Sequence, residues 1–108
     1  MPRSYTVEFA GVDQRDLQSI VEFMATDDPV TALRLMGQIE SRAATLTQMP
    51  RRGRVVPELA AFGIQTYREL VVSPWRIIYR ISGRTVYVLA VLDGRRNIED
   101  VLLDRVLR

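Results

Sequence analysis

Three segments in the second half of the chain carry apolar residues at every other position, which is the pattern of a strand with one buried face. They are rich in Val, Ile and aromatic residues, and they cover residues 67–72, 75–81 and 85–92. Ser73-Pro74 and Ser82-Gly83-Arg84 separate them with residues that favour tight turns. The pattern predicts a three-stranded antiparallel meander, and a shorter alternating segment at residues 5–9 predicts one further strand.

Two segments in the first half repeat their apolar residues at the helical spacing of three and four. The first stripe is Leu17, Ile20, Val21 and Met24, and the second is Ala32, Leu35, Met36, Ile39, Ala43 and Leu46. Asp13 is placed to cap the first helix, and Asp28-Pro29 begins the second, which ends before Pro50. The break between them is about three residues, so an antiparallel helix hairpin is predicted. A last helix is predicted after Asn97.

These elements follow one another in the order β-α-α-β-β-β-α, which is an α+β fold. The helix hairpin is predicted to pack on one face of a small, mainly antiparallel sheet. The length suits a single domain that spans residues 1–108. Residues 49–66, between the second helix and the meander, have no clear period, although 57–61 allow a short helical turn. A connector of this length is more often functional than filler.

The turn at Ser73-Pro74 sets the register of the first two strands of the meander, because loops of two and of four residues are centred at the same place. It places Val71 opposite Arg76, Glu69 opposite Ile78 and Tyr67 opposite Arg80. The reverse face of these strands is almost wholly apolar, so it is predicted to pack on the helix hairpin. The last strand is predicted to add Val86, Val88, Ala90 and Leu92 to that face, and Leu89 and Val91 to the other.

The second face of the sheet therefore mixes charged and apolar side chains, which is unusual for a face that meets water. Its predicted members are Glu69, Val71, Arg76, Ile78, Arg80, Leu89 and Val91. Such a mixture is typical of a protein-binding surface. The alternative is that the C-terminal helix folds over this face, since either arrangement buries the apolar side chains.

The composition removes whole classes of chemistry. The chain has no His, no Cys and no Lys, so all 15 of its basic residues are Arg. A Ser-His-Asp triad, a thiolate or imidazole metal site and a P-loop are therefore excluded, and neither a metal nor a cofactor is expected. No apolar run approaches a membrane span and the first residues lack a signal-peptide core, so a cytoplasmic protein without membrane contact is expected.

The charge is unevenly placed. Residues 1–50 carry 4 Arg and 7 acidic residues, whereas residues 51–108 carry 11 Arg and 6 acidic residues. A basic second half indicates an anionic partner, either nucleic acid or an acidic protein. Arg95 and Arg96, near the end of the last strand, would join Arg76 and Arg80 in an anion site that suits phosphate and carboxylates equally.

Two glutamates, Glu58 and Glu69, are the acidic residues best placed for general-base chemistry near those arginines. A glutamate could take the proton of an RNA 2′-hydroxyl while arginines stabilise the charge that develops on the phosphate. The favoured interpretation of Glu69 is nevertheless a pair with an arginine across the sheet, because pairs of opposite charge are common on neighbouring strands.

Two strings in the predicted meander carry a family resemblance. The string YRELVVSPWRIIYR at 67–80 and the string VLAVLDGRR at 88–96 resemble the C-terminal core of the RelE/ParE superfamily, the toxins of bacterial type II toxin–antitoxin pairs. The connector from Pro50 to Leu59 and the helix hairpin after a first strand are similar too. The resemblance implies a toxin that stops growth and that a cognate antitoxin holds inactive in a hetero-oligomer.

The resemblance also implies one of two mechanisms. Some members are ribosome-dependent endonucleases that cut mRNA, and these share an arginine at the position of Arg76 and in some cases a glutamate at the position of Glu58. They tend to carry basic residues where this chain has Tyr67 and Glu69. The ParE-like branch instead blocks DNA gyrase, and the string at 67–80 reads more like that branch.

We therefore predict a ParE-like toxin that inhibits DNA gyrase by binding, with no catalytic residue. Its predicted partner-binding residues are Tyr67, Glu69, Arg76, Ile78, Arg80, Leu89, Val91, Arg95 and Arg96. The alternative is a ribosome-dependent mRNA endonuclease that uses Glu58, Arg76 and Arg95. A third interpretation, a small RNA-binding module, rests only on the basic second half.

Overall fold

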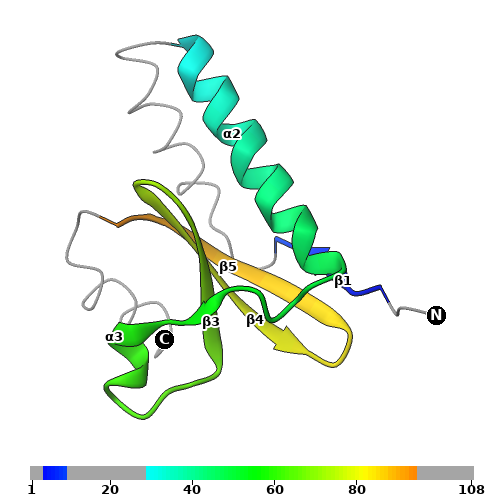
Figure 1. The fold of residues 1–108 in the computed structure, drawn as a ribbon, viewed down its shortest axis with the longest axis vertical. Helices are drawn as coiled ribbons and strands as arrows, with labels where there is room; N and C mark the ends of the chain where they lie inside the picture. Colours follow the sequence, from blue (N-terminus) through cyan, green and yellow to red (C-terminus); the bar gives the residue numbers. More distant parts are fainter. Residues whose placement is uncertain (1–3, 10–28, 95–108) are drawn as a thin grey trace.

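The structure is a computed structural model, and it describes residues 4–9 and 29–94. Its elements in chain order are β1 (Thr6–Glu8), α2 (Pro29–Ala44), the 3₁₀ helix η1 (Thr45–Thr47), β2 (Arg54–Val55), α3 (Pro57–Ala60), β3 (Tyr67–Val72), β4 (Trp75–Ser82) and β5 (Thr85–Asp93) (Figure 1). The helices predicted from Asp13 and after Asn97 lie outside the described residues. None of the helices in the described part of the chain has the length and hydropathy that a membrane span requires.

The strands form one five-stranded sheet in the order β1-β5-β4-β3-β2. The predicted meander is confirmed, because β3, β4 and β5 are antiparallel neighbours and each ends within one residue of its predicted end. β1 pairs in parallel with β5, and β2 pairs antiparallel with β3. The α+β class and the mainly antiparallel sheet are thus confirmed. The strand β2 was not predicted from the sequence, because two residues are too few to show an alternating pattern.

One face of the sheet packs against α2, as the apolar stripe of this helix predicts (Figure 1). The buried residues that α2 and η1 contribute are Leu35, Ile39, Ala43 and Leu46. They meet the apolar face of the sheet, whose buried members are Leu70, Trp75, Ile77, Tyr79, Val86, Val88 and Val91. Removal of this apolar surface from water is the main stabilising contribution that the two layers make to each other.

The register of the first two meander strands is the predicted one, but a β-bulge interrupts the pairing of β4 with β5. Ile78 pairs with Ala90 while the next residue, Tyr79, pairs with Val88, so Leu89 is the extra residue of the bulge. An extra residue reverses the alternation of side chains beyond it. The predictions for Ala90, Val91 and Leu92 are therefore wrong: Val91 is buried on the α2 side, and Ala90 and Leu92 lie on the opposite side.

The opposite face of the sheet, predicted to be open, is covered by α3 and the segments that flank it. Val56 and Leu59 pack on Ile78 and the end of β5, with Ile64 and Tyr67 at the margin of this cluster. Pro57 stands at the start of α3, where its fixed φ and missing N–H suit the first helical turn. As a result Glu69, Arg76 and Ile78 are only 1%, 7% and 1% exposed, so the prediction that they form an exposed surface is wrong.

Candidate functional site

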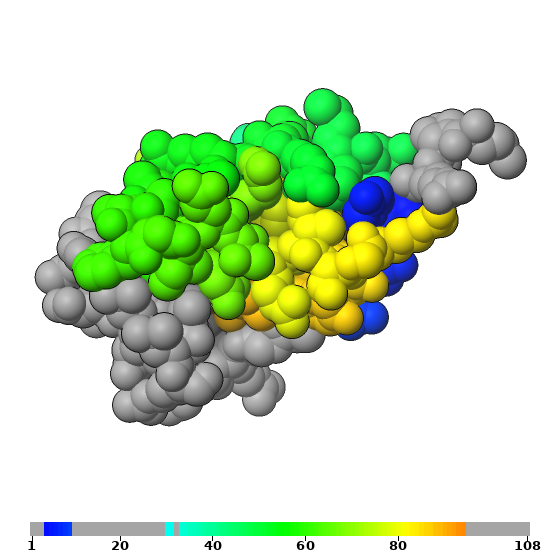
Figure 2. All heavy atoms as spheres, turned by 90° about the horizontal axis from the view of Figure 1, so that it is seen from below, coloured from blue at the N-terminus to red at the C-terminus, as the bar shows by residue number. Residues whose placement is uncertain are grey.

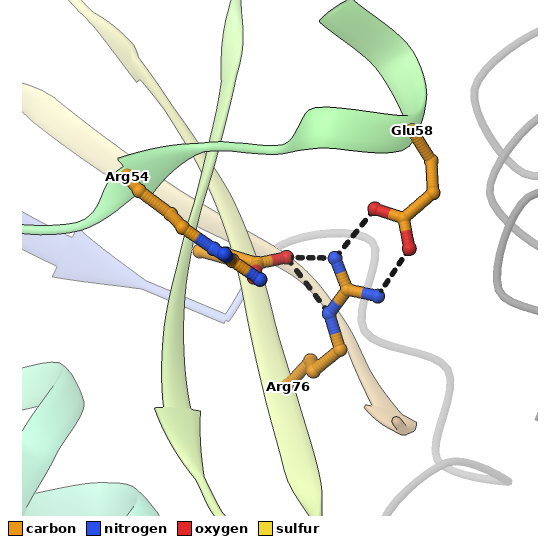
Figure 3. A network of polar contacts seen from close by, with 4 residues as sticks. Arg54, Glu58 and Arg76 are labelled. Atoms are coloured by element: carbon orange, nitrogen blue, oxygen red, sulfur yellow. Dashed lines mark hydrogen bonds and ion pairs between the residues drawn. The ribbon is translucent and has the colours of Figure 1, made fainter. Parts of the chain in front are cut away.

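Four charged side chains converge on the face of the sheet that α3 covers. Arg54 comes from β2, Glu58 from α3, Glu69 from β3 and Arg76 from β4, and the labelled side chains point toward one another (Figure 3). The backbone register brings them together, because Arg54 is the cross-strand partner of Glu69. Chain segments up to 22 positions apart therefore meet in one group, which we call the charge network.

Arg76 is the centre of the charge network. Its Nη1 donates to Glu58 Oε2 at 2.6 Å and its Nη2 donates to Glu58 Oε1 at 2.7 Å, which is the two-bonded fork of an arginine–carboxylate pair. Its Nε donates to Glu69 Oε1 at 2.8 Å, and Nη2 also donates to that oxygen. All three guanidinium nitrogens of Arg76 are therefore used by carboxylates.

Glu69 is the most deeply buried member of the charge network, with a side chain that is 0% exposed. Its second oxygen, Oε2, accepts a hydrogen bond from Arg54 Nε at 2.8 Å and forms an ion pair with Arg54 Nη2 at 2.7 Å. The predicted pairing of Glu69 with an arginine across the sheet is thus confirmed. Exposure rises outward from 9% for the side chain of Arg76 to 28% for Glu58 and 64% for Arg54, so the network runs from the core to the surface.

The charge network shifts the pKa values of Glu58 and Arg76. The Arg76 hydrogen bonds lower the pKa of Glu58 below its ordinary value, against the effect of burial. The pKa of Arg76 is raised, chiefly by its hydrogen bonds to Glu58 and also by Glu69. A general base works best when its pKa lies near the working pH. Glu58 therefore has the properties of a structural anion and is poorly suited to abstracting a proton.

The lowered pKa of Glu58 predicts an acid-sensitive contribution to stability. A carboxyl whose pKa is lower in the folded state stabilises fully above the unfolded value of 4.5, and this contribution is lost as the pH falls through the folded value. We expect the difference in urea midpoint between the wild type and Glu58→Gln to stay constant from about pH 7 to about pH 5 and to shrink below that. A difference that is equal at about pH 3 and about pH 7 would contradict the assignment.

The other predicted binding residues lie in different surroundings. Arg80 is half-buried, with its guanidinium carbon 4.9 Å from the centroid of the Tyr87 ring, and it pairs across the strands with Tyr67. Leu89 is half-buried at the bulge. Arg95 and Arg96 lie outside the described residues. Arg54 is a member of the network that sequence analysis missed, because it stands in a connector without a period.

A second polar cluster fixes the connector between η1 and β2 onto the α2 side of the sheet. The hydroxyl of Tyr79 donates to the carbonyl oxygen of Pro50 at 2.8 Å and accepts from the N–H of Gly53 at 3.0 Å. Arg68 Nη1 donates to the carbonyl oxygens of Gly53 at 2.8 Å and Arg51 at 3.4 Å. Burial raises the pKa of Tyr79, so the hydroxyl stays protonated and available as a donor.

The described surface also has a groove of about 580 Å³ between α2 and the end of β3. Its lining residues are Arg34, Gly37, Gln38, Ser41, Arg42, Val71, Val72 and Ser73. Val71 is 45% exposed, and Leu33, also on α2, is 74% exposed. A surface that combines arginines with exposed apolar side chains is typical of protein interfaces.

Known proteins resemble this chain in sequence and in fold. A family model described as the ParE toxin of the type II toxin–antitoxin system parDE matches residues 7–98. Toxin ParE3 of Caulobacter vibrioides is 38% identical over 63 residues, and this match spans 58% of the chain and 59% of the length of that relative. A solved structure of the chromosomal ParDE TA system from P. aeruginosa is also similar, with a TM-score of 0.67 and 18% sequence identity. The match covers 82% of this chain and 95% of that one. This structural match shows that the two chains share a fold.

Proposed function

The chain belongs to the ParE toxin family of type II toxin–antitoxin systems, and from this premise we propose that it arrests growth by binding DNA gyrase in the cytoplasm. A cognate antitoxin would neutralise it in a hetero-oligomer. No cofactor or metal enters this proposal, since the activity consists of binding. Among the described residues no group of three or more acidic side chains could hold a metal ion.

The pairing of Glu58 with Arg76 is the observation that favours binding over catalysis. The alternative endonuclease would use Glu58 as a base and Arg76 to stabilise charge on phosphate, as well as Arg95, which lies outside the described residues. In the structure the two groups neutralise each other through two hydrogen bonds of 2.6 and 2.7 Å. Four of the five N–H donors of Arg76 bind carboxylates, which leaves a single N–H for a scissile phosphate. This use of its donors supports a structural role for the pair.

Expression of the chain without an antitoxin should stop growth, and the purified chain should inhibit supercoiling by purified gyrase. Glu58→Gln tests the mechanism, because it keeps the shape of the side chain and removes only its proton-accepting charge. Loss of a general base costs about 10²–10⁴-fold in rate, whereas a binding inhibitor has no such dependence. We therefore expect Glu58→Gln to inhibit growth and supercoiling about as strongly as the wild type at matched expression.

Glu40→Gln is the matched control, because Glu40 is exposed on α2 and lies outside the charge network. Antitoxin binding by each variant reports that it is folded. A folded Glu58→Gln variant that is non-toxic while Glu40→Gln stays toxic would contradict the binding mechanism. Normal supercoiling together with mRNA cleaved at the ribosome would replace gyrase by the endonuclease alternative.

A further inference from the structure

Three arginines gather where the connector crosses the α2 side of the sheet. Arg51 and Arg52 stand in the connector, both exposed, and Arg68 reaches them from β3 with its bond to the carbonyl oxygen of Arg51. We call these three residues the basic turn. Burial raises the pKa of Tyr79, and the charges of all three arginines act against this effect, so the basic turn presents its positive charge around the Tyr79 hydroxyl. In Figure 2 the green part of the chain, to which the connector belongs, lies at the surface.

The backbone of the basic turn is held in place before any partner arrives. The Tyr79 hydroxyl bridges Pro50 and Gly53, which flank Arg51 and Arg52 on either side. The N–H of Arg52 also donates to the carbonyl oxygen of Met49 at 3.2 Å, which closes a turn. A segment that is ordered in the free protein loses less conformational entropy on binding. This order is consistent with a preformed contact surface.

The charges of the basic turn are not balanced by acidic side chains in the described part of the chain. Arg54, two positions further on, is paired with Glu69, but neither Arg51 nor Arg52 forms a side-chain hydrogen bond or ion pair with a described residue. Like charges held side by side repel one another, so an anionic partner would be stabilised here.

We propose that the basic turn binds the phosphodiester backbone of duplex DNA. The side chains beside it are polar, with Gln48 Nε2 donating to Ser4 Oγ at 3.3 Å, and amide and hydroxyl groups are common phosphate ligands. An acidic protein would need buried apolar anchors as well, and Met49, 59% exposed, is the one large exposed apolar side chain in residues 47–55. The choice of DNA over RNA rests on the proposed function, because gyrase holds duplex DNA.

A contact of this size is weak by itself. Non-specific DNA binding through a few arginines has a dissociation constant of about 10⁻⁴–10⁻⁶ M at physiological salt. On gyrase the same contact would be intramolecular in effect, because the enzyme holds its DNA beside the bound inhibitor. The basic turn would then lengthen the lifetime of the inhibitor on gyrase that carries DNA.

Fluorescence anisotropy of a labelled DNA duplex, titrated with the purified chain at several salt concentrations, tests the proposal without gyrase. Each phosphate contact contributes about 0.9 to the slope of log affinity against log salt. We expect Arg51→Gln/Arg52→Gln to weaken binding and to reduce the size of this slope by about 2. Arg34→Gln/Arg84→Gln is the matched control, because it removes the same charge from exposed arginines on α2 and in the β4–β5 turn, and it should leave the slope nearly unchanged.

Three results would overturn the proposal. The first is an equal loss of slope in both double variants, which would indicate a general effect of net charge. The second is unchanged DNA binding with a loss of antitoxin affinity in Arg51→Gln/Arg52→Gln, which would make the basic turn a protein site. The third is tighter binding to an RNA duplex of the same length. Failure of the chain to inhibit gyrase, with DNA binding intact, would instead contradict the proposed function and leave the DNA contact standing.

Discussion

Replacement of Glu69 by Gln should lower the free energy of unfolding by about 3–5 kcal/mol, the usual cost of removing one partner of a buried ion pair. The Glu69 side chain is fully buried, and its two oxygens serve Arg76 and Arg54 separately. An amide keeps one acceptor but turns a donor toward one of the arginines. The buried charge of Arg76 is then compensated only by Glu58. Urea unfolding followed by circular dichroism measures the change.

Glu58→Gln is the matched comparison for this prediction, because it makes the same chemical change at the outer end of the same network. Glu58 is partly exposed, so water can solvate the arginine that it leaves, and we expect a cost of about 1 kcal/mol. Equal costs for the two variants would show that burial does not set the energy of the charge network. The comparison also shows why Glu69→Gln is unsuited to testing catalysis, since a loss of toxicity there would follow from unfolding.

The strands and α2 could be predicted from the sequence because each has a strong local signal. The helix from Leu35 to Leu46 has a single apolar face that it can bury. The turn at Ser73-Pro74 allows only one assignment of the residues of β3 and β4 to the two faces of the sheet. The bulge at Leu89 could not be predicted, because every residue from Val88 to Leu92 is apolar and either set of alternate positions could face α2. When a strand is buried on both faces, its sequence pattern does not indicate which face of the sheet each residue occupies.

The charge network could be predicted only in part for a related reason. The pairing of Glu69 with Arg76 follows from the register of β3 and β4, which places the two side chains on the same face of neighbouring strands, so the predicted turn was enough to indicate it. The pairing with Arg54 depends on β2, which the sequence did not predict. The bond from Arg76 to Glu58 depends on the position of α3 on the sheet. That position is set by the tertiary packing of Val56 and Leu59. The centre of the face that indicated an exposed binding surface is therefore interior, because Glu69, Arg76 and Ile78 are buried and the two charges are paired within the chain. Arg80 and Leu89, nearer its margin, are half-buried.

The connector offers a last prediction in which one substitution has opposite effects at two glycines. A Cβ atom built on Gly53 would lie 2.5 Å from the carbonyl oxygen of Glu69 and 2.5 Å from the hydroxyl oxygen of Tyr79. Both contacts are far below van der Waals distance, and the first is with backbone, which cannot rotate away. A Cβ atom built on Gly37, in the middle of α2, would have no neighbouring atom within 4 Å. Gly53 is therefore required by packing, whereas Gly37 only weakens its helix.

Gly53→Ala should destabilise the chain by about 3 kcal/mol, because the connector must move off the sheet and the Tyr79 hydrogen bonds to Pro50 and Gly53 weaken with it. Gly37→Ala should stabilise it by about 1 kcal/mol, since alanine is the better helix former and meets no obstacle. Thermal unfolding of the two variants beside the wild type measures both changes. Because the basic turn depends on the same hydrogen bonds, Gly53→Ala should also weaken DNA binding at a temperature where the variant is still folded. A Gly53→Ala variant as stable as the wild type would show that the connector is not held against the sheet by Tyr79.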